Sequence, residues 1–240
     1  MTSTGGPAVI GLLGGMSWPS TVTYYRAVNE GVAARLGGSH SARMVVWSPD
    51  YAEVESRQLA EDWHGAGELL AEGARRLAAA GADVLAIACN TMHRVAGAVG
   101  AACDLPLIDI VEVTAAATRR RGITRAAVLG TRFTAAGGQF TGALAAHGVE
   151  PVLPAPGDQR LIDRLIYEEL CLGTTNERSA DEFRRLCERL RGEGVDGIVL
   201  ACTELGLLLP AAERAAPEVV DTVDAHVAAL VTASLAHLSN

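Results

Sequence analysis

One pattern occurs twice in the chain, as GADVLAIACNT at residues 81–91 and as GVDGIVLACTE at residues 194–204. In each copy a glycine and an aspartate precede a short apolar run, which ends in Ala-Cys and is followed by polar residues. An apolar run of this length, bounded by glycine and polar residues, is typical of a buried strand in a parallel sheet. The repeat therefore indicates two similar α/β units in one chain.

The sequence around each copy predicts the same order of elements. A strand followed by a glycine turn opens each half, at Gly14-Gly15 and at Gly130, and amphipathic helices separate the strands. Predicted strands cover residues 8–13, 42–47, 83–88, 126–129, 149–153 and 198–201. Predicted helices cover residues 20–35, 63–80, 139–147, 159–170 and 180–191.

These elements predict two similar α/β domains with parallel sheets, related by a pseudo-twofold axis. We expect the first domain at residues 1–112 and the second at residues 113–216, with a C-terminal helix over residues 217–240 that packs on the first. Ligands of such sheets bind beyond the carboxyl ends of the strands. Cys89 and Cys202 each follow a strand there, so we expect their thiols in one cleft between the domains.

The composition excludes several classes of protein. All 20 basic residues are arginine, so the chain has no lysine for a pyridoxal-phosphate Schiff base or for a Walker A phosphate loop. The formal charge of −8 disfavours nucleic acid as a partner. The sequence has no apolar stretch long enough to span a membrane and no basic leader, which predicts a cytoplasmic protein with reduced thiols.

Two of the five cysteines stand out. Most buried cysteines are small apolar core residues, and we expect that role for Cys103, Cys171 and Cys187. Cys89 and Cys202 occupy equivalent positions in the repeat, and each precedes a predicted helix start, which would lower the pKa of its thiol. A zinc site would need closer ligand pairs, and a redox pair would need adjacent sulfurs. Acid–base chemistry on two faces of one substrate carbon fits the repeat.

Four motifs stand at the predicted strand ends: GLLGGMS at residues 11–17, CNTMH at 89–93, Gly130-Thr131, and CTE at 202–204. Together they resemble the aspartate/glutamate racemase superfamily, with the greatest likeness to its aspartate racemase and broad-specificity amino-acid racemase branch. The likeness covers roughly residues 8–230. It implies an amino-acid isomerase of two α/β domains that uses two cysteines, needs no cofactor or metal, and forms a homodimer.

By this resemblance Cys89 and Cys202 are the two acid–base residues, and a further set of side chains binds the substrate. That set is Met16, Ser17, Gln58, Asn90, Thr91, Thr131, Arg160 and Thr203. Helix capping is an equal alternative for Asn90 and Thr203. His93 either supports Cys89 from the next helical turn or is a structural histidine. Glu204 either tunes Cys202 or is an exposed residue at a helix start.

One departure from the superfamily concerns the partner of the substrate side chain. Its aspartate racemases place a cationic residue there, in some a lysine, and this chain lacks an arginine at the expected spacing after Pro49-Asp50. Arg57 or Arg160 is the candidate replacement, and Gln58 would offer neutral hydrogen bonds. We expect racemisation with aspartate favoured or with broad specificity. The alternatives are a sister reaction, such as maleate isomerisation or hydantoin racemisation, and a protein that binds small carboxylates without turnover.

Overall fold

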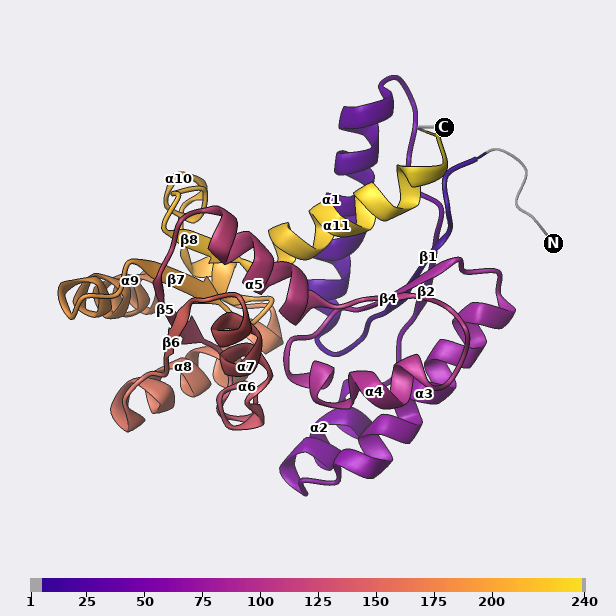
Figure 1. Ribbon diagram of the computed structural model, residues 1–240. Helices are drawn as coiled ribbons and strands as arrows, with labels where there is room; N and C mark the ends of the chain where they lie inside the picture. The colour runs from indigo at the N-terminus through magenta and orange to yellow at the C-terminus, as the bar shows by residue number, and fades with distance from the viewer. Residues whose placement is uncertain (1–5, 239–240) are drawn as a thin grey trace. The chain divides into compact units, whose positions relative to one another are not determined.

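The computed structural model describes residues 6–238, apart from the side chain of residue 237. The chain forms two compact units (Figure 1): one holds the residues up to Ile110 and from His226 onward, and the other is Val111–Ala225. Each unit contains a four-stranded parallel sheet with helices packed against it, which confirms the predicted α/β class. Residues 1–5 of the first predicted domain and residues 239–240 of the predicted last helix lie outside the described residues.

The sheet of the first unit has the strand order β2-β1-β3-β4, and every neighbouring pair is parallel. Leu13 at the end of β1 lies opposite Ile87 at the end of β3. The segments that follow these two strands therefore start side by side at one edge of the sheet. The strands are β1 (Ile10–Leu13), β2 (Met44–Trp47), β3 (Val84–Ile87) and β4 (Leu107–Ile108).

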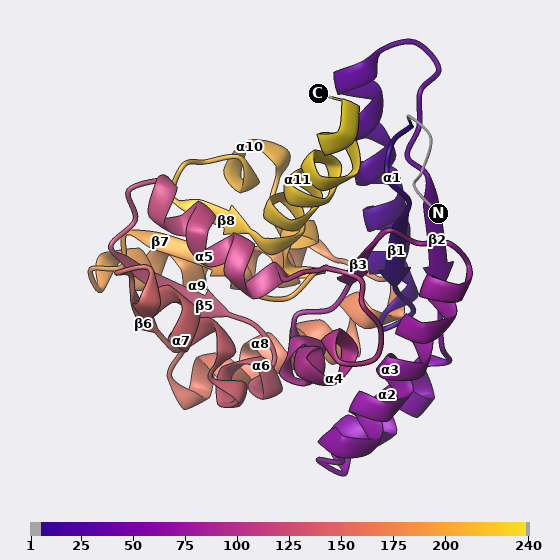
Figure 2. The ribbon, with the colours of Figure 1, turned by 45° about the vertical axis from the view of Figure 1, so that its right-hand side comes forward.

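Helices cover both faces of this sheet. Helices α1 and α11 lie side by side on one face, where the Arg35 guanidinium donates a hydrogen bond to Thr232 Oγ1 over 3.1 Å, and α2, α3 and α4 lie on the other (Figures 1 and 2). Helix α11 starts in the second unit and continues in the first. The helices are α1 (Trp18–Leu36), α2 (Tyr51–Leu59), α3 (Trp63–Ala79), α4 (Ala96–Gly100) and α11 (Thr222–Leu235), with 3-10 helices at Thr91–Val95 and Ala236–Leu238.

The second unit repeats the topology with the strand order β6-β5-β7-β8, all parallel. Leu129 at the end of β5 lies opposite Leu200 at the end of β7, as in the first sheet. The strands are β5 (Arg125–Leu129), β6 (Glu150–Val152), β7 (Gly197–Leu200) and β8 (Val219–Asp221). The helices are α5 (Ile110–Arg120), α6 (Arg132–Gly137), α7 (Gln139–Ala146), α8 (Pro156–Glu168), α9 (Glu177–Gly192) and α10 (Ala211–Arg214), with 3-10 helices at Leu170–Leu172 and Leu205–Leu208.

Two glycines at the strand ends allow close approach of neighbouring segments. Gly15 follows β1 with φ +75°, and a Cβ there would lie 2.5 Å from the Ser48 hydroxyl oxygen. A Cβ on Gly130, after β5, would lie 2.5 Å from the carbonyl oxygen of Ala201. Both positions therefore require glycine, because any side chain would force the edge of the sheet apart.

The structure corrects the prediction at several points. The helix predicted from residue 217 begins at Thr222, because the buried, β-branched segment Val219–Asp221 pairs with β7 as strand β8. The predictions also lacked the helices α2, α4, α5, α6 and α10 and the two-residue strand β4. The strands and helices that were predicted are all present, with ends that differ by a few residues.

Candidate active site

The predicted site residues form two groups, one at the carboxyl edge of each sheet. Gln58 on α2 and Arg160 on α8 belong to neither group. In the first unit residues 16–17 follow β1, and residues 89–91 follow the adjacent strand β3. In the second unit Thr131 follows β5, and residues 202–203 follow the adjacent strand β7. Within each unit, the sheet topology therefore brings together residues that are far apart in the sequence.

Ser17 has the most unusual backbone and side chain at the edge of the first sheet. Its φ of 92° lies in the left-handed region that side chains rarely adopt. The residue is only 3% exposed, and its hydroxyl has no hydrogen-bond partner among the residues the structure describes. It is the N-cap residue of α1, yet its side chain makes no capping bond. Strain and an unsatisfied buried hydroxyl at a helix start are typical of a ligand-binding position.

Cys89 lies between β3 and the 3-10 helix Thr91–Val95, with its side chain half-buried. The neighbouring Asn90 and Thr91 are buried. His93, one turn further on, is also buried, and its ring nitrogen Nδ1 lies 2.9 Å from the carbonyl oxygen of Cys89. His93 therefore contacts the backbone of Cys89. This contact is what we expect if His93 supports Cys89 from the next helical turn.

Gln58, predicted to bind substrate, lies in the interior. It is 3% exposed on α2, and its Nε2 donates a hydrogen bond to the sulfur of Met92 over 3.1 Å. The two candidate cations lie on helix surfaces: Arg57 donates to the Glu53 carbonyl oxygen of its own helix over 2.9 Å, and Arg160 is exposed on α8. Within residues 6–238, neither arginine makes a hydrogen bond or an ion pair with another predicted site residue.

Cys202 is buried against a carboxylate. Its thiol donates a hydrogen bond to Glu204 Oε2 over 3.1 Å, and the Thr203 hydroxyl donates to the same oxygen over 2.8 Å. Burial raises the pKa of the Cys202 thiol well above its ordinary range, and the nearby charge of Glu204 raises it further. At neutral pH Cys202 is therefore a thiol that can donate a proton.

The expectation that a helix start lowers the pKa of this thiol is wrong for Cys202. The helix that follows is a four-residue 3-10 helix, Leu205–Leu208, and a carboxylate stands between it and the thiol. Glu204 itself is only 2% exposed, so it is not the exposed helix-start residue that the sequence left open. Its position supports the other interpretation, in which it tunes Cys202.

Tyr167 is a residue of this group that the sequence analysis did not identify. It extends from α8, is hydrogen-bonded to the side chain of Thr131, and lies near Cys202. Burial raises the pKa of its phenol, and the charge of an ionised Cys202 would raise it further. The phenol therefore remains a neutral hydrogen-bonding group. A tyrosine in an amphipathic helix has the sequence signal of a core residue, so no motif pointed to it.

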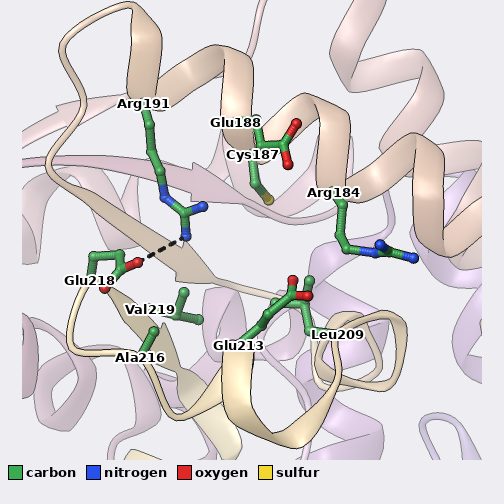
Figure 3. Close-up of a pocket in the computed structure, with 9 residues that line it drawn as sticks. All are labelled: Arg184, Cys187, Glu188, Arg191, Leu209, Glu213, Ala216, Glu218 and Val219. Carbon is green, nitrogen blue, oxygen red and sulfur yellow. Dashed lines mark ion pairs between the residues drawn. The ribbon is translucent and has the colours of Figure 1, made fainter.

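Cys103, Cys171 and Cys187 do not follow a strand. Cys171 nevertheless lies near enough to Cys202 that its charge, when ionised, further raises the pKa of that thiol. All five cysteines are thiols. Cys187 is buried on α9, where burial raises the pKa of its thiol to about 12. It lines a cavity of about 210 Å³ between α9 and α10 together with charged residues, among them Arg191, which pairs with Glu218 over 3.5 Å (Figure 3). This cavity contains no predicted site residue.

Within residues 6–238, no three His, Cys, Asp or Glu side chains are grouped so that they could hold a metal ion. No helix in the same range has the length and apolar character needed to cross a membrane.

The comparison with known proteins decides the family. A family model for Asp/Glu/hydantoin racemases matches residues 13–230. The chain belongs to the Asp/Glu/hydantoin racemase family. This confirms the resemblance seen in the sequence motifs.

Solved structures agree with this assignment. A candidate Asp/Glu racemase from Yersinia pestis is 43% identical, with a TM-score of 0.85 over 95% of this chain and 99% of that one. An aspartate racemase homologue from Pyrococcus horikoshii OT3 is 29% identical, with a TM-score of 0.81 over 95% and 99%. The aspartate racemase of Picrophilus torridus shares the fold at 24% identity, with a TM-score of 0.80 over 95% and 94%.

Proposed function

We propose that this member of the racemase family inverts the Cα of an amino acid through two thiols, Cys89 and Cys202, without a cofactor. The observation that carries the proposal is the thiol of Cys202, which is buried and hydrogen-bonded to Glu204 over 3.1 Å. A two-base racemase needs one thiol and one thiolate at rest. Cys202, with its raised pKa, suits the thiol, and Cys89 is assigned the thiolate.

The proposed reaction balances without an added reagent. The Cys89 thiolate takes the Cα proton, and the electron pair of the C–H bond stays on the substrate as a carbanion. The Cys202 thiol donates its proton to the opposite face, so that a new C–H bond forms and Cys202 becomes a thiolate. The enzyme is then set for the other enantiomer, or it returns to its first state by proton exchange with solvent. Thr203 and Glu204 hold the Cys202 proton in place through the shared carboxylate oxygen.

The substrate's carboxylate and ammonium groups would be bound by the polar residues of the two sheet edges. Ser17 supports this role best, because its hydroxyl is buried without a partner among the described residues at the N-terminus of a 19-residue helix. Such a helix end favours a carboxylate. Asn90, Thr91, Thr131 and Thr203 are assigned to the same task, with Met16 and Gln58 lining the pocket.

Among amino acids we propose aspartate as the preferred substrate, with broad specificity as the alternative. The similarity to an aspartate racemase homologue at 29% identity supports aspartate. A buried side-chain carboxylate needs a positive partner, and Arg160, exposed on α8, is the candidate. The test compares kcat/KM for aspartate, glutamate, homoserine and methionine. A neutral amino acid that exceeds aspartate by about tenfold would refute the preference and leave the two-thiol mechanism standing.

The reaction itself is tested by exchange at Cα. Each L-amino acid of the panel is incubated with the enzyme in deuterated water, and the products are analysed by NMR and chiral chromatography. A racemase introduces deuterium at Cα and forms the D-enantiomer. A maleate isomerase, a hydantoin racemase or a protein that only binds carboxylates would do neither with an amino acid.

The two bases are tested by substitution. Cys89→Ala and Cys202→Ala should each lower kcat by about 10²-fold or more, the usual cost of losing a general base. Cys103→Ala is the matched control, since Cys103 is a half-buried thiol of the first unit outside the group and should keep most activity. Turnover near that of the wild type in either of the first two variants would refute the mechanism. A homodimer is also proposed, and sedimentation velocity measures it directly.

A further inference from the structure

The chain passes between the two units twice, after Ile110 and before His226. At each of these two points, a buried histidine of the first unit makes hydrogen bonds with the chain. His226 is the first residue after the second passage and is 0% exposed. His93 is 4% exposed, and its Nε2 lies 3.2 Å from the backbone nitrogen of Ile110, the last residue before the first passage.

The hydrogen-bond partners determine the protonation of both rings. The Ile110 N–H can only donate and the Cys89 carbonyl can only accept, so His93 carries its proton on Nδ1 and donates it to Cys89 over 2.9 Å. His226 faces the carbonyl of Ile108 with Nε2 over 2.8 Å, so that nitrogen carries the proton. Its Nδ1 then accepts from the Tyr24 hydroxyl over 2.8 Å. Both rings are therefore neutral, and each uses both nitrogens.

The two rings form one connected structure beside Cys89. Their centroids lie 6.2 Å apart in an edge-to-face arrangement, and His226 packs in the same way on Tyr24 at 5.6 Å. Their backbone partners, Ile108 and Ile110, lie two residues apart at the end of the edge strand β4. The pair thus links α1, α11 and the end of β4 to the carbonyl of Cys89. We refer to His93 and His226 as the histidine clamp.

We propose that His93 is a positioning residue for Cys89, and that the histidine clamp ties the backbone of Cys89 to the two segments where the chain passes between the units. The role in turnover rests on the proposed racemase function. A misplacement of about 1 Å in a reacting group lowers the rate by about 10²-fold, so a fixed carbonyl at Cys89 keeps its thiol aligned with the substrate Cα. His93 itself touches no reacting atom in this assignment.

Two amide substitutions separate the bonds of His93. The amide nitrogen of asparagine reaches about where Nδ1 lies, so His93→Asn keeps the donor to Cys89 and loses the acceptor for Ile110. Glutamine places its oxygen about where Nε2 lies, so His93→Gln keeps the Ile110 bond and loses the Cys89 bond. We expect His93→Gln to lower kcat by about tenfold or more with KM within about threefold, and His93→Asn to stay within about threefold in both. His64→Gln, an exposed histidine on α3, is the control.

A second readout does not depend on the reaction. The rate of Cys89 alkylation by iodoacetamide, followed by peptide mass spectrometry, should rise about fivefold or more in His93→Gln, because the released carbonyl loosens the thiol. The rate at Cys202 should stay within about twofold in all variants, and that at Cys89 should be unchanged in His93→Asn. If the wild type shows no Cα exchange, the proposed function fails, and this measurement still decides the positioning role.

A purely structural histidine predicts a different pattern. Both variants would then lose thermal stability and activity together, and Cys89 alkylation would not separate them. Equal losses in His93→Asn and His93→Gln, or no loss in either, overturn the proposal. If His93→Gln does not fold, His93→Met takes its place, because methionine has a similar volume and can donate no hydrogen bond to Cys89. Its kcat and its rate of Cys89 alkylation are then compared with those of His93→Asn.

Discussion

Acid should destabilise the first unit through the histidine clamp. Burial, with a smaller contribution from nearby His93, lowers the pKa of His226 from the ordinary 6.5 to about 3. Burial also lowers the pKa of His93, although Asp109, 4.0 Å from its Nε2, opposes the shift. Between pH 6.5 and 3 the unfolded chain binds a proton at residue 226 that the folded protein excludes. The free energy of unfolding therefore falls as the pH falls through this range.

The magnitude follows from the size of the shift. Each pH unit in this window removes about 1.4 kcal/mol for one histidine, so the drop from 6.5 to about 3 removes roughly 5 kcal/mol. This is a large share of the 5–15 kcal/mol that typically stabilises a folded protein, roughly a third or more. The stability of the first unit is therefore expected to fall steadily between pH 6 and 4.5 because of His226.

Urea unfolding at pH 7, 6, 5 and 4.5 measures this effect. The chain's tryptophans, Trp18, Trp47 and Trp63, all lie in the first unit, so their fluorescence reports that unit. The glutamine of His226→Gln cannot titrate. In the difference between the unfolding free energies of wild type and variant, the titration of the groups that both proteins share largely cancels. As the pH falls, the unfolding free energy of the wild type relative to His226→Gln should decrease by about 1.4 kcal/mol per pH unit. A His226→Gln difference that stays within about 0.5 kcal/mol from pH 7 to 4.5 would refute the reasoning.

Further expectations concern the two sheet edges. Glu204→Gln removes a charge that raises the pKa of the Cys202 thiol, so alkylation of Cys202 at pH 8 should become about threefold faster or more; an unchanged rate would contradict the role of Glu204. Ser17→Gly relieves the positive φ and should raise the free energy of unfolding by about 1 kcal/mol, while KM rises because the hydroxyl is lost; a lower stability would contradict the strain. Dialysis against a chelator should leave activity intact; a loss restored by metal would contradict a cofactor-free reaction.

The fold of each unit was largely predictable because its central strands are continuous apolar runs. β1, β3, β5 and β7 are all fully or almost fully buried, and buried strands are the segments that composition marks most clearly. The edge strand β4 escaped prediction because a two-residue strand has no periodicity. Strand β8 was predicted as part of the helix that follows it. Its sequence, VVDTVDAHV, has apolar residues at the spacing of a strand and also at the spacing of a helix, and only the pairing with β7 shows where the strand ends.

The candidate site was predictable to a different degree at each cysteine. The repeat marked both Cys89 and Cys202, since equivalent positions in two copies rarely share a cysteine by chance. The direction of the pKa shift at Cys202 was not predictable, because it depends on how deeply Glu204 is buried. Tyr167 was missed for the same reason: its contact with Thr131 joins residues on a helix and a strand end.

The sequence by itself determined the central strands of both sheets, the longer helices between them, their order, and which residues stand at the ends of the buried strands. These properties depend on hydrophobic periodicity and on turn residues, which are local in the chain. Only the tertiary structure decided the electrostatics and the bonding of the buried polar groups. His93 contacts Ile110, His226 contacts Tyr24 and Ile108, and Glu204 is shielded from water by the packing around it. Protonation in an interior depends on desolvation and on partners that the fold brings together, and neither is encoded at any single position.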